Sequence, residues 1–127
     1  MNQLTFELLP GTYSLCRLEP HEGVPDWVYL STFFSVTKSR EELSIVCEEY
    51  LVPEHTTVED NWRLLRIVGT LDLSLTGITA QFSTPLAEVG INICVIATYD
   101  TDYLMVKSDQ ILKTLQTLKK AGFEVQA

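Results

Sequence analysis

The chain has 127 residues, of which 46% are hydrophobic and 20% are charged, and its formal net charge is −8. That apolar content is enough for a packed core and excludes a disordered composition. The charge is unevenly distributed: residues 1–61 hold 11 acidic and 3 basic side chains, whereas residues 62–127 hold 6 of each. An acidic chain without a basic cluster is poorly suited to nucleic acid or an anionic membrane, so both are excluded as main partners.

The cellular compartment follows from the N-terminus and the cysteines. The first residues carry neither the basic nor the apolar segment of a secretory signal, and no apolar run reaches the ~20 residues that span a bilayer. We therefore expect a cytoplasmic protein. Cys16, Cys47 and Cys94 each lie in an apolar run and outside any CxxC pair, which favours buried thiols in a reducing compartment.

The N-terminal half is rich in strands. Alternating apolar residues predict four of them, over residues 4–9, 13–18, 28–36 and 43–47. Pro20, Gly23 and Pro25 leave room for only a short helix or an irregular loop, and the polar residues 53–61 predict a connection or one helical turn. This half is either a small, mostly antiparallel unit or a degenerate copy of the C-terminal one with shortened helices; we favour the copy.

The C-terminal half has a clearer pattern. Residues 62–69 predict a strand, because they are rich in large apolar side chains. Apolar residues then follow at helical spacing: Ile78, Phe82, Leu86 and Val89. Pro85 is expected to kink this helix or to restart it, and Gly90 to end it. Residues 91–98 predict a second strand, and apolar side chains on both of its faces indicate burial on both sides.

A turn, a strand, a helix and a last strand complete this half. Residues 99–102 are polar and turn-like, and residues 103–106 return to an extended segment. Ser108 is expected to cap a second helix that ends at Gly122. The apolar positions of that helix are Ile111, Leu112, Leu115 and Leu118. A short last strand follows at residues 123–125.

The order strand–helix–strand–strand–helix–strand defines the fold class. It is the split βαβ arrangement of ferredoxin-like α+β folds. We therefore predict two domains, a degenerate, strand-rich unit over residues 1–61 and a complete ferredoxin-like unit over residues 62–127.

No pattern of catalytic, metal-binding or cofactor-binding residues is present. His21 and His55 have no partner at metal-ligand spacing, and there is no phosphate-binding loop or nucleophile motif. Adjacent acids such as Glu41 and Glu42 would point to opposite faces of a strand, so they are not an acid–base pair. We predict a protein that is not an enzyme and that needs no cofactor or metal.

Polar residues gather at one end of the predicted C-terminal sheet. The loop over residues 71–77 leads into a helix whose first N–H groups, at Gly77 and Ile78, are suited to a carboxylate. Thr98 ends a neighbouring strand, and Asp100 and Asp102 follow it. A helix end beside an acidic turn is complementary to a zwitterion such as an amino acid. The alternative is that these Asp and Thr residues only serve turn chemistry.

Two stretches of this half resemble the ACT domain family. They cover residues 77–93 and 97–106, and the second contains a small-Thr-aromatic-x-x-Asp-aromatic run that leads into a strand. More narrowly, the chain is similar to the branch that includes the CASTOR arginine sensors and short bacterial ACT domain-containing proteins. The resemblance covers residues 62–126 well; residues 33–37 and 42–47 resemble the same relatives less specifically.

The resemblance implies a regulatory module that binds an amino acid at an interface between ACT units. Carried over by motif, Gly77 and Ile78 would hold the carboxylate, and Thr98, Tyr99 and Asp102 would serve the amino group or side chain. Asp100 and Thr101 fall at variable positions. The arginine sensors have about four ACT-like units and this chain at most two, so a site between equivalent units implies a homodimer. The alternative is an ACT-fold protein-interaction module that binds no ligand.

Overall fold

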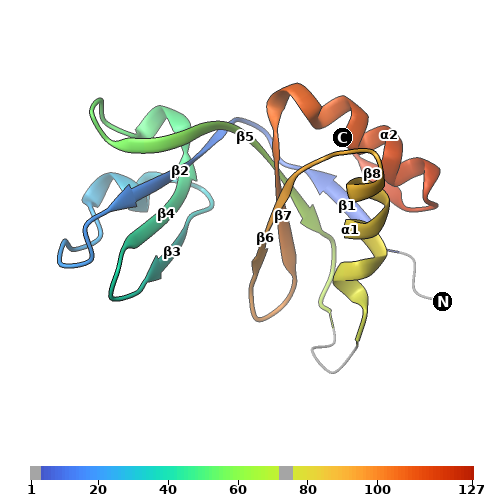
Figure 1. The fold of residues 1–127 in the computed structure, drawn as a ribbon, viewed down its shortest axis with the longest axis horizontal. Coiled ribbons are helices and arrows are strands. Elements are labelled where there is room, and N and C mark those ends of the chain that lie inside the picture. Colours follow the sequence, from blue (N-terminus) through green and yellow to red (C-terminus); the bar gives the residue numbers. More distant parts are fainter. Residues whose placement is uncertain (1–3, 72–75) are drawn as a thin grey trace. The chain divides into compact units, whose positions relative to one another are not determined.

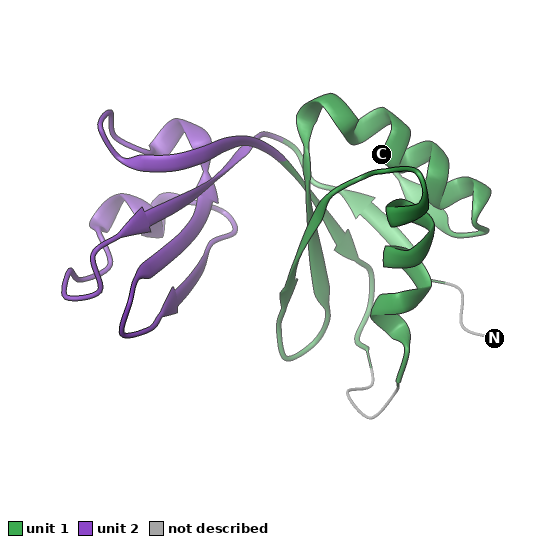
Figure 2. Ribbon diagram, viewed as in Figure 1, with its two compact units in different colours: residues 1–10, 63–127 green, residues 11–62 purple. Residues whose placement is uncertain are grey.

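A computed structural model of the protein describes residues 4–71 and 76–127 and divides the chain into two units (Figure 2). Unit 1 contains residues 1–10 and 63–127, and unit 2 contains residues 11–62. The predicted division placed the first ten residues in the N-terminal domain. The structure differs there, because those residues join the C-terminal part of the chain.

Unit 1 combines a five-stranded sheet with two α-helices (Figure 1). Its elements are β1 (Thr5–Leu8), the end of β5 (Thr57–Ile67), α1 (Ile78–Glu88), β6 (Ile93–Ala97), β7 (Asp102–Lys107), the 3-10 turn η3 (Ser108–Gln110), α2 (Ile111–Lys120) and β8 (Glu124–Gln126). The strands lie in the order β6-β7-β5-β1-β8. The predicted ferredoxin-like order of elements is therefore confirmed, with one strand added.

The added strand is β1, which lies between β5 and β8. Phe6 is opposite Ile67 in an antiparallel pair with β5, and opposite Val125 in a parallel pair with β8. In the usual split βαβ arrangement the last strand would pair directly with the first. Here β8 has only three residues, and β1 supplies the longer central partner. This pairing is the physical reason why residues 1–10 belong to unit 1.

The core of unit 1 lies between the sheet and both helices. Phe82 and Leu86 of α1 and Leu115 and Leu118 of α2 are buried against the strands. The predicted helical stripes were wrong at their margins, because Val89 and Leu112 are exposed. Val89 is the C-cap residue that follows α1, and Leu112 lies on the exposed side of α2.

The ends of the two helices follow the sequence signals only in part. At the end of α1, Ile91 N–H donates to the Leu86 carbonyl and Gly90 N–H to the Ala87 carbonyl, which with Gly90 at φ 79° is a Schellman cap. Pro85 lies inside α1 without ending it. The expected cap at Ser108 was wrong, because Ser108 lies in the turn η3 and α2 begins at Ile111.

The strand β6 differs from its prediction. Among the described strands it pairs only with β7, so it lies at the edge of its sheet. Cys94 and Ile96 are half-buried and Val95 is 39% exposed. The expectation of burial on both faces was therefore wrong: apolar side chains on both faces of a strand did not reveal whether neighbouring elements cover it.

Unit 2 has the same strand topology with almost no helix. Its elements are β2 (Tyr13–Leu18), the 3-10 turn η1 (Asp26–Leu30), β3 (Ser35–Lys38), β4 (Leu43–Glu48), the 3-10 turn η2 (Glu49–Leu51) and the beginning of β5. The strands lie in the antiparallel order β3-β4-β2-β5. This is the ferredoxin-like order with 3-10 turns in place of the helices, so the degenerate, strand-rich copy is confirmed. The predicted strand over residues 28–36 was wrong, because Val28 lies in η1.

The core of unit 2 is small and contains two cysteines. Cys16 and Cys47 are buried together with Val28 and Ile45. The thiol of Cys47 donates a hydrogen bond to Cys16, and this bond together with burial raises the pKa of Cys47. The predicted burial of these two thiols is confirmed, whereas Cys94 in β6 is only half-buried.

Candidate functional site

The predicted site residues lie at one end of unit 1, where β5 and β6 end and α1 begins (Figure 1). β5 and β6 run parallel in the split βαβ arrangement, so their carboxyl ends meet at the same edge of the sheet. The hairpin between β6 and β7 carries Thr98, Tyr99, Asp100, Thr101 and Asp102. Residues 72–75 of the predicted binding loop lie outside the described residues.

Thr98 closes the hairpin turn. Its backbone N–H and its hydroxyl both donate to the Thr101 carbonyl, over 2.8 and 2.9 Å, and its Oγ1 accepts from the Thr101 N–H over 3.2 Å. The hydroxyl proton of Thr98 is therefore already used. This is the turn chemistry that the sequence offered as the alternative interpretation.

Thr101 and Asp100 connect the hairpin to the end of β5. The Thr101 side chain is 6% exposed, and its hydroxyl donates to the Ile67 carbonyl over 2.8 Å. The Asp100 carbonyl accepts a 2.6 Å hydrogen bond from the Leu71 N–H. These bonds hold the tip of the hairpin against the segment that leads toward α1.

The start of α1 presents backbone groups rather than a side-chain cap. Gly77 is the N-cap at φ 77° and makes no side-chain cap hydrogen bond, while its carbonyl accepts from the Gln81 N–H. Among residues 4–71 and 76–127, a side chain at position 77 would meet nothing within 4 Å. Ile78 anchors the first turn by packing on the core of unit 1. First-turn N–H groups have no partner inside a helix and are suited to an anion.

The side chains of Asp102, Tyr99 and Asp100 make no hydrogen bond or ion pair among the described residues, and that of Asp100 is exposed. Asp102 is half-buried at the start of β7, opposite Ala97. Strand alternation puts it on the face that carries Leu104 and Val106 into the core. Within residues 4–71 and 76–127 its carboxylate has no hydrogen-bond or ion-pair partner. Tyr99 is 84% exposed.

The arrangement therefore separates the seven predicted residues into two groups. Thr98, Asp100 and Thr101 hold the hairpin and its neighbour in place through bonds within the unit. Asp102, Tyr99 and the backbone at the start of α1 have hydrogen-bonding capacity left for a ligand. The Asp102 carboxylate and the N–H groups at the start of α1, which have no partner among the described residues, offer both signs of charge that a zwitterion needs.

Sequence reasoning missed a cavity in unit 2. It has a volume of about 400 Å³ and its lining includes Arg17, Glu22 and His55. The sequence did contain a signal: Arg17 is one of only 3 basic residues among the first 61, and it lies at the end of a predicted strand. The three-dimensional proximity of His55 to Arg17 had no sequence signal.

Comparison with known families gives the class of protein. A sequence model of the ACT domain matches residues 57–120, just over half of the chain, and a second model, of an N-terminal domain, matches residues 11–55. The chain belongs to the ACT domain family. Within the described residues, no helix has the length and apolarity needed to cross a membrane.

Solved structures agree with this assignment. A crystal structure of a protein from Agobacterium tumefaciens shares 33% sequence identity at a TM-score of 0.92, over 98% of this chain and 93% of that one. The ligand-free regulatory subunit of aspartate kinase from Thermus thermophilus has a TM-score of 0.66 at 9% identity, over 95% and 99% of the two chains. Aspartokinase III of E. coli, solved with aspartate and ADP, has a TM-score of 0.61 at 16% identity, over 95% of this chain and 33% of that one. The two kinase likenesses show the fold alone.

Proposed function

We propose that this protein is a non-catalytic regulatory module that binds a free amino acid. The observation that carries the proposal is the half-buried Asp102 carboxylate, which has no partner among the described residues and lies at the sheet end where α1 begins. A carboxylate that is partly desolvated and unpaired gains by accepting hydrogen bonds from a ligand's ammonium group.

Each site residue has a role in this proposal. The backbone N–H groups of Gly77 and Ile78 hold the ligand's carboxylate, and Asp102 holds its amino group. Tyr99 contacts the ligand's side chain, and Thr98 closes the turn that carries Tyr99. Asp100 and Thr101 position the hairpin through their bonds to Leu71 and Ile67. Membership of the ACT family supports this, as does the fold shared with aspartokinase III, a protein solved with aspartate.

We propose further that the binding site is completed by a second copy of the chain in a cytoplasmic homodimer. The edge strand β6 supports this, because it leaves backbone groups and the half-exposed Val95 available on its outer side. An isologous contact through such an edge would bring two equivalent units together. The resemblance to arginine sensors makes arginine one candidate ligand among the amino acids.

The test is a thermal-shift screen of all proteinogenic amino acids at millimolar concentration. A ligand present at a hundredfold excess over its Kd stabilises the protein by about 2.7 kcal/mol. We expect Asp102→Asn to abolish that stabilisation, because it removes the negative charge and preserves the shape. Asp109→Asn, which alters an exposed acid of the same unit, should leave it intact.

Two results would count against the proposal. One is the absence of any response to any amino acid, which would favour the ligand-free interaction module. The other is an equal response of the wild type and Asp102→Asn. Sedimentation with and without the responding amino acid tests the dimer separately, and a monomer under both conditions would exclude it.

A further inference from the structure

Unit 2 contains a cavity of about 400 Å³ that is open to solvent and that the proposed site in unit 1 does not involve. Its wall combines one cation, two carboxylates, an imidazole and an indole: Arg17, Glu19, Glu22, His55 and Trp27. All five belong to residues 11–62, so the cavity lies wholly within one unit. Its volume is in the range of small-molecule sites, which is about 300–1,000 Å³.

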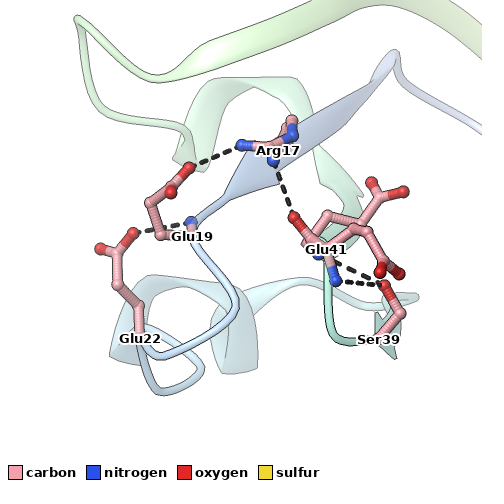
Figure 3. A network of polar contacts seen from close by, with 6 residues as sticks. Arg17, Glu19, Glu22, Ser39 and Glu41 are labelled. Carbon is pink, nitrogen blue, oxygen red and sulfur yellow. Dashed lines mark hydrogen bonds and ion pairs between the residues drawn. The ribbon is translucent and has the colours of Figure 1, made fainter.

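Arg17 is held at the mouth of this cavity by two hydrogen bonds (Figure 3). Its Nη1 donates to Glu19 over 2.7 Å, and its Nη2 donates to the Glu41 carbonyl over 2.8 Å. Glu41 is itself held through its N–H, which donates to the Ser39 hydroxyl. A guanidinium has five N–H donors, and Arg17 uses two of them among the described residues. The other three N–H donors of Arg17 have no partner among the described residues.

The carboxylates are also only partly used. One oxygen of Glu22 accepts from the Glu19 N–H over 2.9 Å, which fixes the Glu22 side chain near the cavity (Figure 3). Its other oxygen has no partner among the described residues. One carboxylate oxygen of Glu19 accepts from Arg17. The cavity thus has hydrogen-bond acceptors next to donors, and the hydrogen bonds described above hold Arg17 and Glu22 in place.

The rest of the wall contains Trp27 and His55 together with Leu18, Pro25, Thr56 and Thr57. Trp27 packs on the core of unit 2 from the turn η1. His55 has a φ of 71°, which is a left-handed backbone conformation. An indole face next to carboxylates favours an ammonium group, through its negative π-face.

The charges select the class of ligand. A simple anion would be attracted by Arg17 but repelled by Glu19 and Glu22, and a simple amine would meet the reverse. A molecule that has a carboxylate and an ammonium group can pair with Arg17 through the first and with the glutamates through the second. We propose that this cavity binds a free α-amino acid, with its carboxylate on Arg17, its ammonium on Glu22 and its side chain along Trp27. This would be a second amino-acid site, independent of the site proposed in unit 1.

The experiment is a site-resolved titration of the full ¹⁵N-labelled chain with each proteinogenic amino acid. Amide signals of residues 17–22 and 55–57 report the cavity, and those of residues 98–103 report the proposed site in unit 1. The indole N–H of Trp27, assigned with Trp27→Phe, is a further reporter. For each amino acid that shifts the cavity signals, its decarboxylated amine and its deaminated acid are titrated as probes.

We expect at least one amino acid to shift the cavity signals, and its amine and acid counterparts to bind at least about tenfold more weakly. Glu22→Gln keeps the acceptor for the Glu19 N–H but removes the charge, and should weaken binding by a similar factor. The matched control is Glu54→Gln, because Glu54 is an exposed acid of the same unit outside the cavity lining.

The outcomes separate the two sites. Shifts confined to residues 98–103 would overturn the cavity proposal and leave the function proposed for unit 1 standing. Shifts at the cavity alone would support the cavity proposal and remove the site in unit 1. Three further results would each overturn the cavity proposal. They are equal binding of the amine or the acid counterpart, equal effects of Glu22→Gln and Glu54→Gln, and no cavity shift with any amino acid.

Discussion

The two units share a strand topology but differ in what covers the sheet. In unit 1 the split βαβ crossovers are α1 and α2, of 11 and 10 residues, whereas unit 2 has only the 3-10 turns η1 and η2, of 5 and 3 residues. Both nevertheless keep the ferredoxin-like order of strands. The same strand order therefore forms with helices in unit 1 and without them in unit 2. Helices are one way to bury the apolar face of the sheet.

Unit 2 buries its face with side chains from irregular segments. Val28 of η1 is fully buried, and Val24 and Trp27 pack on the same cluster. Because one short turn covers less apolar surface than a helix does, the core of unit 2 should contribute less to stability than the core of unit 1. The cavity of unit 2 includes Trp27 in its lining.

The largest expected effect is a core deletion in unit 1. Phe82 is fully buried in α1 and makes an edge-on ring contact with Phe6, with ring centroids 5.7 Å apart. Phe82→Ala should lower the free energy of unfolding by about 3–5 kcal/mol, measured by urea denaturation, since it removes this contact and leaves a void. Leu112→Ala is the control, because that side chain is 73% exposed. Equal effects of the two would refute the assigned core.

A smaller effect is expected in unit 2. Val28→Ala removes two methyl groups from a smaller core and should cost about 2 kcal/mol. Pulsed alkylation with mass spectrometry reads each unit separately, because Cys16 and Cys47 lie in unit 2 and Cys94 in unit 1. In Val28→Ala we expect Cys16 and Cys47 to be alkylated faster and the alkylation rate of Cys94 to stay unchanged. Leu30→Ala alters an exposed side chain and is the control, so it should change none of the three rates. A rise at all three thiols would mean that the two units unfold as one.

The smallest effect concerns the hairpin of the proposed site. Thr101→Val keeps the shape of the side chain but leaves the Ile67 carbonyl without its hydrogen bond, which should cost about 1–2 kcal/mol in urea denaturation. The same change at the exposed Thr37 of β3, in unit 2, should be close to neutral. If Thr101→Val were also neutral, the bond to Ile67 would not hold the hairpin.

Charge also distinguishes the two regions. The surplus of acidic residues lies in the first 61 residues. Two of these acids, Glu19 and Glu22, are exposed and line the cavity with Arg17. In the C-terminal part, where the charges balance, the role proposed for Asp102 rests on the position of its carboxylate rather than on the net charge of the region. The sites proposed in the two units both rest on local arrangement.

Much of unit 1 was predictable from sequence because local rules act within one segment. The spacing of Phe82 and Leu86 identified α1, and Gly90 identified its end, since glycine adopts the positive φ that a Schellman cap requires. The prediction failed where neighbours decide: β6 is an edge strand, and Val28 lies in a turn rather than in a strand. The seven predicted site residues lie at one end of the sheet of unit 1, but their hydrogen bonds could not be predicted.

The sequence by itself determined the order of elements and the ACT family, because periodicity, capping and motif are properties of consecutive residues. Only the tertiary structure decided that β1 pairs with β5 and β8, because a period of two identifies a strand but not its partner. For the same reason it alone brought Arg17 and His55 to one cavity and left Asp102 unpaired among the described residues. Such proximity between distant residues depends on how strands pair, which no single segment encodes.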